Sequence, residues 1–265
     1  MSIDDRRRLI VERVNKQGKV TISELCDLFG VSEMTVRRDL RDLDQIGLIH
    51  RIHGGAVSRI GRSYEPAYTV RATTGLEAKK AIGRKAAEFV HDGDSICIDT
   101  GTTTVEFARA LKDRRNLTIL TSSMTIANEI ISNFSLLNDV RLILTGGIIR
   151  AGEFSMIGDI ARTTFKSLHV DKAFLGIGGV DLEAGLTEYN LDDAEIIRAA
   201  ISSAQQNIIL ADSSKLGRVT FAHIGQLEDI DRIITDQDAA QDMVEALTQH
   251  GVDVVVAEYK TETGE

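Results

Sequence analysis

The sequence contains few cysteines and no long apolar run. Only Cys26 and Cys97 occur among 265 residues, far apart, each inside an apolar stretch and without a metal-ligating neighbour. This pattern excludes a disulfide-stabilised scaffold and favours a reduced, cytoplasmic setting. No apolar run approaches the roughly 20 residues of a membrane-spanning helix, and the N-terminal residues are too charged for a signal peptide. We therefore expect a cytoplasmic protein without membrane contact.

Internal repeats and low-complexity segments are also missing, and the length is sufficient for two ordinary domains. The net charge of -9 would argue against a nucleic-acid partner if it were evenly spread. Residues 1–60, however, carry 11 Lys and Arg against 9 Asp and Glu, a balance of +2, whereas the remainder carries 20 against 31, a balance of -11. This asymmetry restricts a nucleic-acid partner to the first segment.

The stretch 21–56 has the pattern of a helix, a tight turn, a second helix and a wing. Thr21 stands three residues before Glu24, which is the spacing of a capping box, and Gly30 ends the first helix. Ser32 is a candidate N-cap for the second helix. In that helix Val36, Leu40 and Leu43 fall on one side at helical spacing, and Met34, Arg37, Arg38 and Arg41 fall on the other.

A supporting helix is predicted over 3–16, and a two-stranded wing is predicted over 48–57 with its turn at Gly54 and Gly55. This order predicts a winged helix-turn-helix, in which Arg37 and Arg38, beside Met34 and Thr35, would reach base edges. Arg41, Arg51 and His53 would contact phosphates. The predicted DNA-contacting residues are Ser32, Met34, Thr35, Arg37, Arg38, Arg41, Arg51 and His53. Two alternatives stay open: surface ion pairs of Arg38 or Arg41 with Asp39, Asp42 or Asp44, and a winged helix that contacts protein.

From residue 76 the pattern changes to helices that alternate with short apolar strands, which is typical of a parallel α/β sheet. Strands are expected at 95–99, 117–121, 140–145, 173–177, 207–211, 232–235 and 252–257, and helices at 78–90, 105–111, 125–131, 192–204 and 239–250. The predicted fold is α/β, with an N-terminal winged helix-turn-helix and a C-terminal open, largely parallel sheet. The expected boundaries are a DNA-binding domain at 1–58, a linker with the single proline at 59–75, an effector domain at 76–258 and a tail at 259–265.

Ligands in open α/β sheets bind at the carboxyl ends of the strands, so the loops after the strands are the candidate site. The first loop reads Asp-Thr-Gly-Thr-Thr-Thr and runs into a helix, which offers backbone amides and hydroxyls to a phosphate. The alternative is an ordinary threonine-capped helix start. The loop lacks the Gly-Lys-Ser/Thr ending of a nucleotide-binding loop, so ATP and GTP are not expected.

Further donors and close-approach glycines follow the next three strands, and an Ala-Asp-Ser-Ser-Lys-Leu-Gly run begins at residue 211. Lys215 would bring a cation to a phosphorylated ligand, while Asp99 and Asp212 would accept hydrogen bonds from sugar hydroxyls. Arg150 is a second anion partner, and Glu188 is either a helix cap or a ligand contact. The predicted effector-binding residues are Asp99, Gly101, Thr102, Thr103, Thr104, Thr121, Ser122, Ser123, Gly146, Gly147, Arg150, Gly178, Gly179, Glu188, Asp212 and Lys215.

The run Ser-Glu-Met-Thr-Val-Arg-Arg-Asp-Leu-Arg-Asp-Leu at 32–43, with Gly-Leu-Ile-His-Arg-Ile-His-Gly-Gly-Ala at 47–56, closely resembles the N-terminal signature of the DeoR family of bacterial transcriptional regulators. The resemblance implies a DNA-binding winged helix whose second helix enters the major groove, normally in a repressor of a sugar-catabolic operon. The loops of the second half also match the family. Its C-terminal domain resembles ribose-phosphate isomerase and CoA-transferase sheets and binds phosphorylated sugars, which implies that Thr102, Thr103 and Thr104 hold the phosphate and Lys215 assists.

The rival interpretation is a sugar-phosphate isomerase-like enzyme, in which Asp99, Glu188, Asp212 and Lys215 would abstract a proton next to a carbonyl. No evident acid–base pair and no nucleophile beside a histidine appear, and a DNA-binding domain would serve no purpose in such an enzyme. We therefore predict a regulator that is not an enzyme, with no cofactor and no bound metal. Its partners would be double-stranded operator DNA, a phosphorylated sugar and further copies of the chain, as a homodimer or homotetramer.

Overall fold

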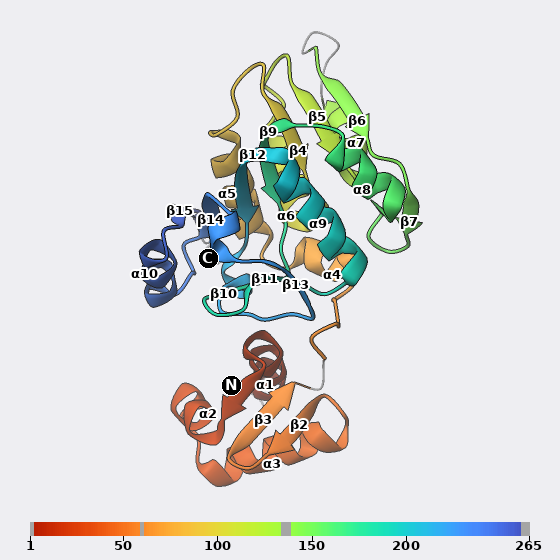
Figure 1. Cartoon of the computed structure of the whole chain (residues 1–265). Helices are drawn as coiled ribbons and strands as arrows, with labels where there is room; N and C mark the ends of the chain where they lie inside the picture. The colour runs from red at the N-terminus through yellow and green to blue at the C-terminus, as the bar shows by residue number, and fades with distance from the viewer. Residues whose placement is uncertain (1–2, 59–60, 134–138, 261–265) are drawn as a thin grey trace. The chain divides into compact units, whose positions relative to one another are not determined.

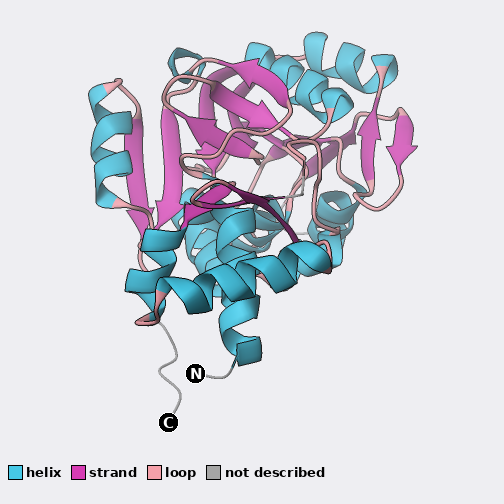
Figure 2. Cartoon of the chain, turned by 90° about the horizontal axis from the view of Figure 1, so that it is seen from below, coloured by secondary structure: helices cyan, strands magenta, loops and turns pink. Residues whose placement is uncertain are grey.

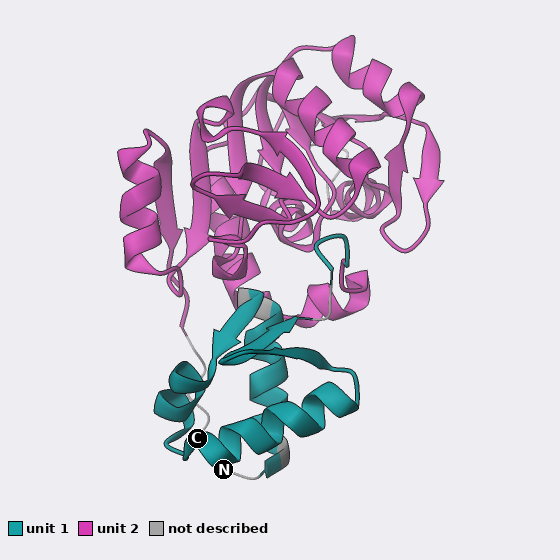
Figure 3. Cartoon of the chain, turned by 60° about the horizontal axis from the view of Figure 1, so that its bottom comes forward, with its two compact units in different colours: residues 1–64 teal, residues 65–265 magenta. Residues whose placement is uncertain are grey.

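The chain consists of two compact units. The computed structural model describes residues 3–58, 61–133 and 139–260. The N-terminal unit spans Met1–Tyr64 and the C-terminal unit spans Glu65–Glu265 (Figure 3). Residues 59 and 60 of the predicted linker and 261–265 of the predicted tail lie outside the described residues.

The N-terminal unit is a three-helix domain with a small antiparallel sheet (Figure 1). Its elements are α1 (Ile3–Gln17), β1 (Lys19–Thr21), α2 (Ile22–Phe29), α3 (Glu33–Gln45), β2 (Ile49–Ile52) and β3 (Gly55–Ser58). The strands pair in the order β1-β3-β2. The predicted capping box is present, because the Thr21 hydroxyl accepts from the Glu24 amide at 3.2 Å and Glu24 accepts from the Thr21 amide at 2.6 Å. The winged helix-turn-helix predicted from the sequence is confirmed.

The C-terminal unit is built on a seven-stranded sheet with the order β15-β14-β12-β9-β4-β5-β6. Every pairing in this sheet is parallel. Its strands are β4 (Ser95–Ile98), β5 (Thr118–Thr121), β6 (Arg141–Leu144), β9 (Val170–Leu175), β12 (Ala204–Leu210), β14 (Arg232–Asp236) and β15 (Asp253–Ala257). The helices are α4 (Tyr68–Thr73), α5 (Leu76–Ala87), α6 (Thr102–Ala110), α7 (Met124–Asn133), α8 (Asp159–Lys166), α9 (Leu191–Ser203) and α10 (Gln241–Gln249).

Helices cover both faces of this sheet, and each face carries its own apolar core (Figure 2). Side chains alternate along a strand, so in β4 Ile96 and Ile98 join the core beneath α5, α6 and α7, while Cys97 joins the core beneath α8 and α9. Burial on both faces explains why the strands are continuous apolar runs in the sequence. The open parallel α/β sheet predicted from that pattern is confirmed.

Several elements depart from the predicted ones. The hairpin β7 (Ile148–Arg150) and β8 (Ser155–Ile157), the helix α8, and the small antiparallel sheet of β10 (Gly179–Asp181), β11 (Gly185–Glu188) and β13 (Ala222–Gly225) were not expected. Two 3-10 turns, η2 (Ser213–Lys215) and η3 (Leu227–Asp229), also occur. The segment predicted as a linker contains the helix α4, and from Glu65 onward it belongs to the C-terminal unit.

Candidate DNA interface and effector site

The helix α3 presents a polar face to solvent because its apolar face is buried in the N-terminal unit. Val36, Leu40 and Leu43 are at most 2% exposed, whereas Met34 is 80% exposed. The side chain of Ser32 caps the helix by accepting from the Thr35 amide at 3.4 Å. The predicted assignment of the two faces is therefore confirmed.

The arginines on the exposed face differ in their surroundings. Arg37 forms an ion pair with Glu33 at 3.0 Å, one helical turn earlier. Arg38 and Arg41 are exposed and form no ion pair with any described residue. The alternative in which these two arginines pair with Asp39, Asp42 or Asp44 is wrong for the described contacts. Asp39 and Asp42 contact Arg6 and Arg7 of α1. Asp44 accepts from the Arg51 amide and lies 3.6 Å from His50. Two uncommitted guanidinium groups thus stand on the solvent face of α3.

Asp39 is the residue that sequence reasoning missed in this unit. Its carboxylate is 3% exposed and accepts from Arg6 Nε at 2.7 Å and from Arg7 Nε at 3.0 Å. Arg7 also contacts Asp42. Asp39 lies between Val36 and Leu40 on the buried side of α3, and that position is the signal that could have identified it. The contacts fix α1 against α3 and so set the orientation of the exposed face.

Replacing Asp39 with Ala is expected to destabilise the N-terminal unit by about 3–5 kcal/mol, because Arg6 would stay buried without its partner. Denaturant unfolding of the full chain, followed by circular dichroism, would show an early transition for this unit. Asp42→Ala is the matched control. Because the Asp42 side chain is 35% exposed, its removal should lower the free energy of unfolding far less. Equal stabilities of the two variants would contradict a structural role of Asp39.

The wing carries the remaining predicted contacts. Arg51 on β2 and His53 in the turn are exposed. The Arg51 amide donates to Asp44 at 3.3 Å, which connects the wing to the end of α3. Both side chains are therefore available at the surface of the same unit as α3.

In the C-terminal unit, sheet topology brings the predicted loops to one edge. The strands β12, β9, β4, β5 and β6 are consecutive neighbours and parallel, so their carboxyl ends share that edge. The loops that begin at Asp99, Ser122, Thr145, Gly176 and Ala211 follow these strands. The convergence that the sequence indicated is present in the fold.

The N-terminus of α6 is the part of this edge most suited to an anion. Gly101 is its N-cap and supplies no side chain to the first turn. The hydroxyls of Thr102 and Thr103 have no hydrogen-bond partner among the described residues, although both residues are below 9% exposed. The Thr104 hydroxyl, in contrast, donates to the Gly101 carbonyl at 2.9 Å. Backbone amides and two uncommitted hydroxyls are what a phosphate requires at a helix N-terminus.

Other predicted hydroxyls and glycines hold the loops in place. The Thr121 hydroxyl donates to the Ile98 carbonyl at 2.7 Å, and the Ser123 hydroxyl accepts from the Ile126 amide at 3.2 Å. Ser122 is buried, and its carbonyl accepts from the Met156 amide. A Cβ atom at Gly147 would lie 2.6 Å from the Ile157 carbonyl oxygen, and one at Gly179 would lie 2.2 Å from that of Arg218. These contacts give the residues a role in the fold itself; Gly146 adjoins α8 in the same loop, near Ile160.

Two buried carboxyl groups border the loop after β9. Glu188 ends β11 and accepts from the Tyr189 amide at 2.7 Å, and burial raises its pKa to about 7. Burial also raises the pKa of Asp99 well above its usual value. A Cβ atom at Gly178 would lie 3.0 Å from Glu188 Oε1, so this glycine leaves room for the carboxyl group. The predicted alternative of Glu188 as a helix cap is wrong, because Asn190 caps α9.

The raised pKa of Glu188 makes stability depend on pH. Between about pH 4.5 and pH 7 the folded chain holds this proton and the unfolded chain releases it, so stability falls as the pH rises. Glu188→Gln mimics the protonated form and is expected to match the wild type at pH 5 and to exceed it at pH 8, by at most on the order of 3 kcal/mol. Thermal unfolding at the two pH values would measure this. The exposed Glu183→Gln serves as control, and a wild-type advantage at pH 8 would contradict the expectation.

The predicted anion partner Arg150 lies in a network of ion pairs. Its guanidinium contacts Glu65 at 2.7 Å and Asp193 at 2.5 Å. Glu65 also contacts Arg71 at 2.9 Å, and Arg71 reaches Glu153. Burial raises the pKa of Asp193 to about 6, although the neighbouring Arg150 acts in the opposite direction. This network attaches residues 65–71, which lie within the predicted linker, to the loops of the C-terminal unit.

Lys79 strengthens the same attachment and was not predicted. It is 5% exposed, and its ammonium donates to the Thr74 carbonyl at 2.8 Å and to the Arg71 carbonyl. These carbonyls lie at the end of α4, where a cation is favourable. Burial lowers the pKa of Lys79, and the nearby Asp212 opposes that effect.

The predicted cation Lys215 lies in η2, near an aromatic ring. Its ammonium is 3.4 Å from the Tyr189 hydroxyl and 5.3 Å from the ring centre. Asp212 caps this turn by accepting from the Ser214 amide at 3.1 Å. Among the described residues no three His, Cys, Asp or Glu side chains form a group able to hold a metal ion. Nor does any helix in the described ranges have the length and apolarity needed to cross a membrane.

Comparison with known proteins identifies both units. Residues 6–60 match the DeoR-like helix-turn-helix domain, and residues 74–237 match the DeoR C terminal sensor domain. The chain belongs to the DeoR family. The glycerol-3-phosphate regulon repressor of Escherichia coli (strain K12) is 33% identical over 252 residues, which cover 95% of this chain and 98% of that protein. The putative aga operon transcriptional repressor of Escherichia coli O157:H7 is 33% identical over 254 residues, 95% of this chain and 93% of that protein.

This DeoR family member is therefore a DNA-binding transcriptional regulator and not an enzyme, as the sequence predicted. The isomerase alternative and the alternative of a winged helix that contacts only protein are set aside by this membership. Ribose 5-phosphate isomerase A from Methanocaldococcus jannaschii is similar over 54% of this chain and 55% of its own, at 19% identity and a TM-score of 0.40. That similarity is too low to bear on function.

Proposed function

We propose that this regulator represses a carbohydrate-catabolic operon and leaves its operator when a phosphorylated sugar binds the C-terminal unit. The observation that carries the proposal is the N-terminus of α6, with the uncommitted hydroxyls of Thr102 and Thr103, in a chain that also contains an exposed arginine face on α3. Two relatives are named as repressors, and one of these names refers to glycerol-3-phosphate, a phosphorylated polyol, which supports a small phosphorylated effector.

On the DNA side, α3 would enter the major groove. Met34, Thr35, Arg37 and Arg38 would meet base edges, while Ser32, Arg41, Arg51 and His53 would contact the backbone. A single winged helix makes few contacts, so a homodimer or homotetramer would place two copies of α3 on a two-fold operator. The protein would act in the cytoplasm, where its DNA and metabolite partners occur together.

On the effector side, the phosphate would bind the amides of α6 and the hydroxyls of Thr102 and Thr103, and Lys215 would add a cation. Asp99, Glu188 and Asp212 would accept hydrogen bonds from sugar hydroxyls. The other predicted positions, at Thr121–Ser123, Gly146, Gly147, Gly178 and Gly179, would shape the surrounding loops.

The coupling would run through Arg150. A bound anion competes with Glu65 for its guanidinium, and Glu65 belongs to the segment that precedes the C-terminal unit's helices. Loss of that contact loosens the attachment of residues 65–71. Each 1.4 kcal/mol or so by which the effector binds the DNA-free arrangement more tightly than the DNA-binding one shifts the equilibrium between the two arrangements tenfold.

The test is a thermal-shift panel of phosphorylated sugars and polyols with their unphosphorylated parents, followed by operator retardation with each compound that binds. We expect a shift only with phosphorylated compounds, and loss of retardation with the same ones. A shift with the unphosphorylated parent alone would refute the phosphate site. Turnover of a sugar phosphate by the purified protein would contradict the regulator-only function.

A further inference from the structure

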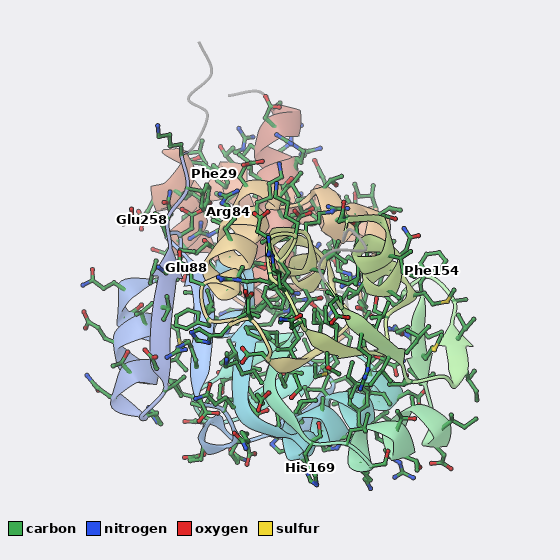
Figure 4. The ribbon with its side chains drawn as sticks, turned by 90° about the horizontal axis from the view of Figure 1, so that it is seen from above. Phe29, Arg84, Glu88, Phe154, His169 and Glu258 are labelled. Atoms are coloured by element: carbon green, nitrogen blue, oxygen red, sulfur yellow. The ribbon has the colours of Figure 1, made fainter. Side chains whose placement is uncertain are left out.

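A carboxylate stands among the exposed arginines of α3, in the first turn of the helix. The preceding helix α2 ends at Phe29, which is labelled in Figure 4, and the chain turns at Gly30 so that Glu33 begins α3. The Glu33 side chain is 65% exposed. Its carboxylate accepts from Arg37 Nη2 at 3.0 Å. Glu33 therefore belongs to the surface that α3 would present to DNA.

The other three carboxylates of α3 contact groups elsewhere in the N-terminal unit. Asp39 and Asp42 contact arginines of α1, and Asp44 accepts from the Arg51 amide. Among the described residues, Glu33 instead has its partner on the exposed face of α3 itself. An acidic residue in the first turn is favourable to the helix dipole, but this effect is small at an exposed site. Packing within the unit thus gives Glu33 no larger role.

A carboxylate that faces DNA is repelled by the phosphates unless a base offers it a hydrogen-bond donor. In the major groove only the amino groups of cytosine and adenine are donors. Adenine places its N7 acceptor beside that amino group, and guanine and thymine present acceptors at the same edge. Cytosine is therefore the base that a carboxylate at this position selects.

The ion pair between Glu33 and Arg37 also matches the spacing of DNA. Its charged groups are 3.0 Å apart, and successive base pairs are about 3.4 Å apart along the duplex. The described contact uses Nη2 of Arg37, and a guanidinium has five N–H donors in all, so others are left for the O6 and N7 acceptors of guanine. The two side chains can thus contact neighbouring base pairs while they remain paired.

We propose that Glu33 is a specificity-determining residue of the DNA interface, which selects a cytosine beside the guanine that Arg37 contacts. The inference rests on the proposed function, because it takes α3 as the helix in the major groove. Glu33 accepts from cytosine N4, and Arg37 donates to guanine in the adjacent base pair. The positive charge of Arg37 offsets the repulsion between the carboxylate and the phosphates. Each half-site of the operator then contains a cytosine and a guanine in adjacent base pairs.

Selection of binding sites by the full chain from a random pool of duplex DNA, at fixed salt, tests this proposal. The wild type should enrich the adjacent cytosine and guanine, and replacing that cytosine should weaken binding roughly 5-fold to 150-fold. Glu33→Ala should lose the preference at this position and bind all sequences more tightly, because a negative charge leaves the interface. Glu33→Gln should prefer adenine there, since a glutamine amide pairs with adenine N6 and N7.

Glu12→Gln is the matched control for these variants. Glu12 lies on α1, its side chain is 58% exposed, and its carboxylate is 3.8 Å from Arg8. This substitution removes the same charge from the same unit and should leave the selected bases unchanged. If Glu33→Ala bound more tightly but selected the same bases as the wild type, the carboxylate would only repel phosphates and the proposal would be wrong. A wild type that selects no cytosine beside a guanine would also overturn it.

Arg38→Ala, measured on the selected DNA, distinguishes failure of this inference from failure of the proposed function. Weaker binding by Arg38→Ala, together with an unchanged base preference of the Glu33 variants, would keep α3 as the reading helix and reject Glu33 alone. Wild-type affinity of Arg38→Ala would reject both. Because Glu33 is exposed, its variants should keep the helical circular dichroism of the wild type and the same thermal shifts with sugar phosphates.

Discussion

Arg38→Ala is expected to weaken operator retardation strongly and leave effector binding unchanged. Arg38 is exposed on α3 and forms no ion pair with the described residues, so its guanidinium is free to meet a base edge. One bidentate base contact contributes about 1–3 kcal/mol, and a two-fold complex contains two of them. Operator affinity should therefore fall by roughly 30-fold to 10⁴-fold. Electrophoretic mobility shift titrations at fixed salt would measure the loss.

Arg8→Ala is the matched control for this variant. Arg8 is also exposed, at 69% of its side chain, but it lies on α1, where its guanidinium is 3.8 Å from Glu12. The Arg8→Ala substitution removes the same charge from the same unit and should change the affinity for the operator little. Arg41→Ala should weaken binding to all sequences alike and reduce the salt dependence. If Arg38→Ala retarded the operator as well as Arg8→Ala does, α3 would not be the reading helix.

Thr103→Val should give a protein that binds the operator and is no longer released by the sugar phosphate. The substitution nearly keeps the shape of the side chain and removes a hydroxyl that has no partner among the described residues. A hydrogen bond to a charged group contributes about 1.5–3 kcal/mol, so effector affinity should fall by about 10-fold to 150-fold. Isothermal titration with the active sugar phosphate, beside retardation assays, would measure both effects.

Thr104→Val is the informative comparison, since its hydroxyl already donates to the Gly101 carbonyl. This variant should lose about 1 kcal/mol of stability through the missing internal hydrogen bond and retain release by the effector. The pair of variants separates binding from folding within a single turn of α6. Release of the Thr103→Val complex at the wild-type concentration of effector would refute the phosphate site.

Much of the fold was predictable because local signals and burial agree. Thr21, Gly30 and Ser32 stand at helix ends that the structure confirms, and the seven parallel strands are the continuous apolar runs of the second half. The hairpin β7–β8 escaped prediction because its strands are short and its exposed isoleucines resemble a core strand in sequence. In the small antiparallel sheet, β11 pairs with β13, which lies more than 30 residues further along the chain, and no local pattern reports such pairing.

The position of the effector site could be predicted from the sequence, but the hydrogen bonds and ion pairs of its side chains could not. Parallel topology alone brings Asp99 and Lys215 to one edge, which the sequence indicated. Which hydroxyls are free depends on tertiary contacts: those of Thr121 and Ser123 are used by the loops, while that of Thr103 is not. Arg150 and Glu65 are 85 residues apart, and their pairing depends on how the segment before α4 folds back.

The strand order also has a consequence for the growing chain. The N-terminal unit ends at Tyr64, and its last strand ends at Ser58, so it can fold while the rest is being synthesised. The first strand of the large sheet, β4, lies between β5 and β9, and β9 begins only at Val170. At ribosomal speeds of about 5–20 residues per second, β4 waits several seconds for its second neighbour. A chain whose synthesis stops before β9 would therefore carry a folded winged helix joined to an incomplete sheet. Because the missing strands leave that sheet exposed, chaperones and proteases would bind such a chain before it could occupy an operator.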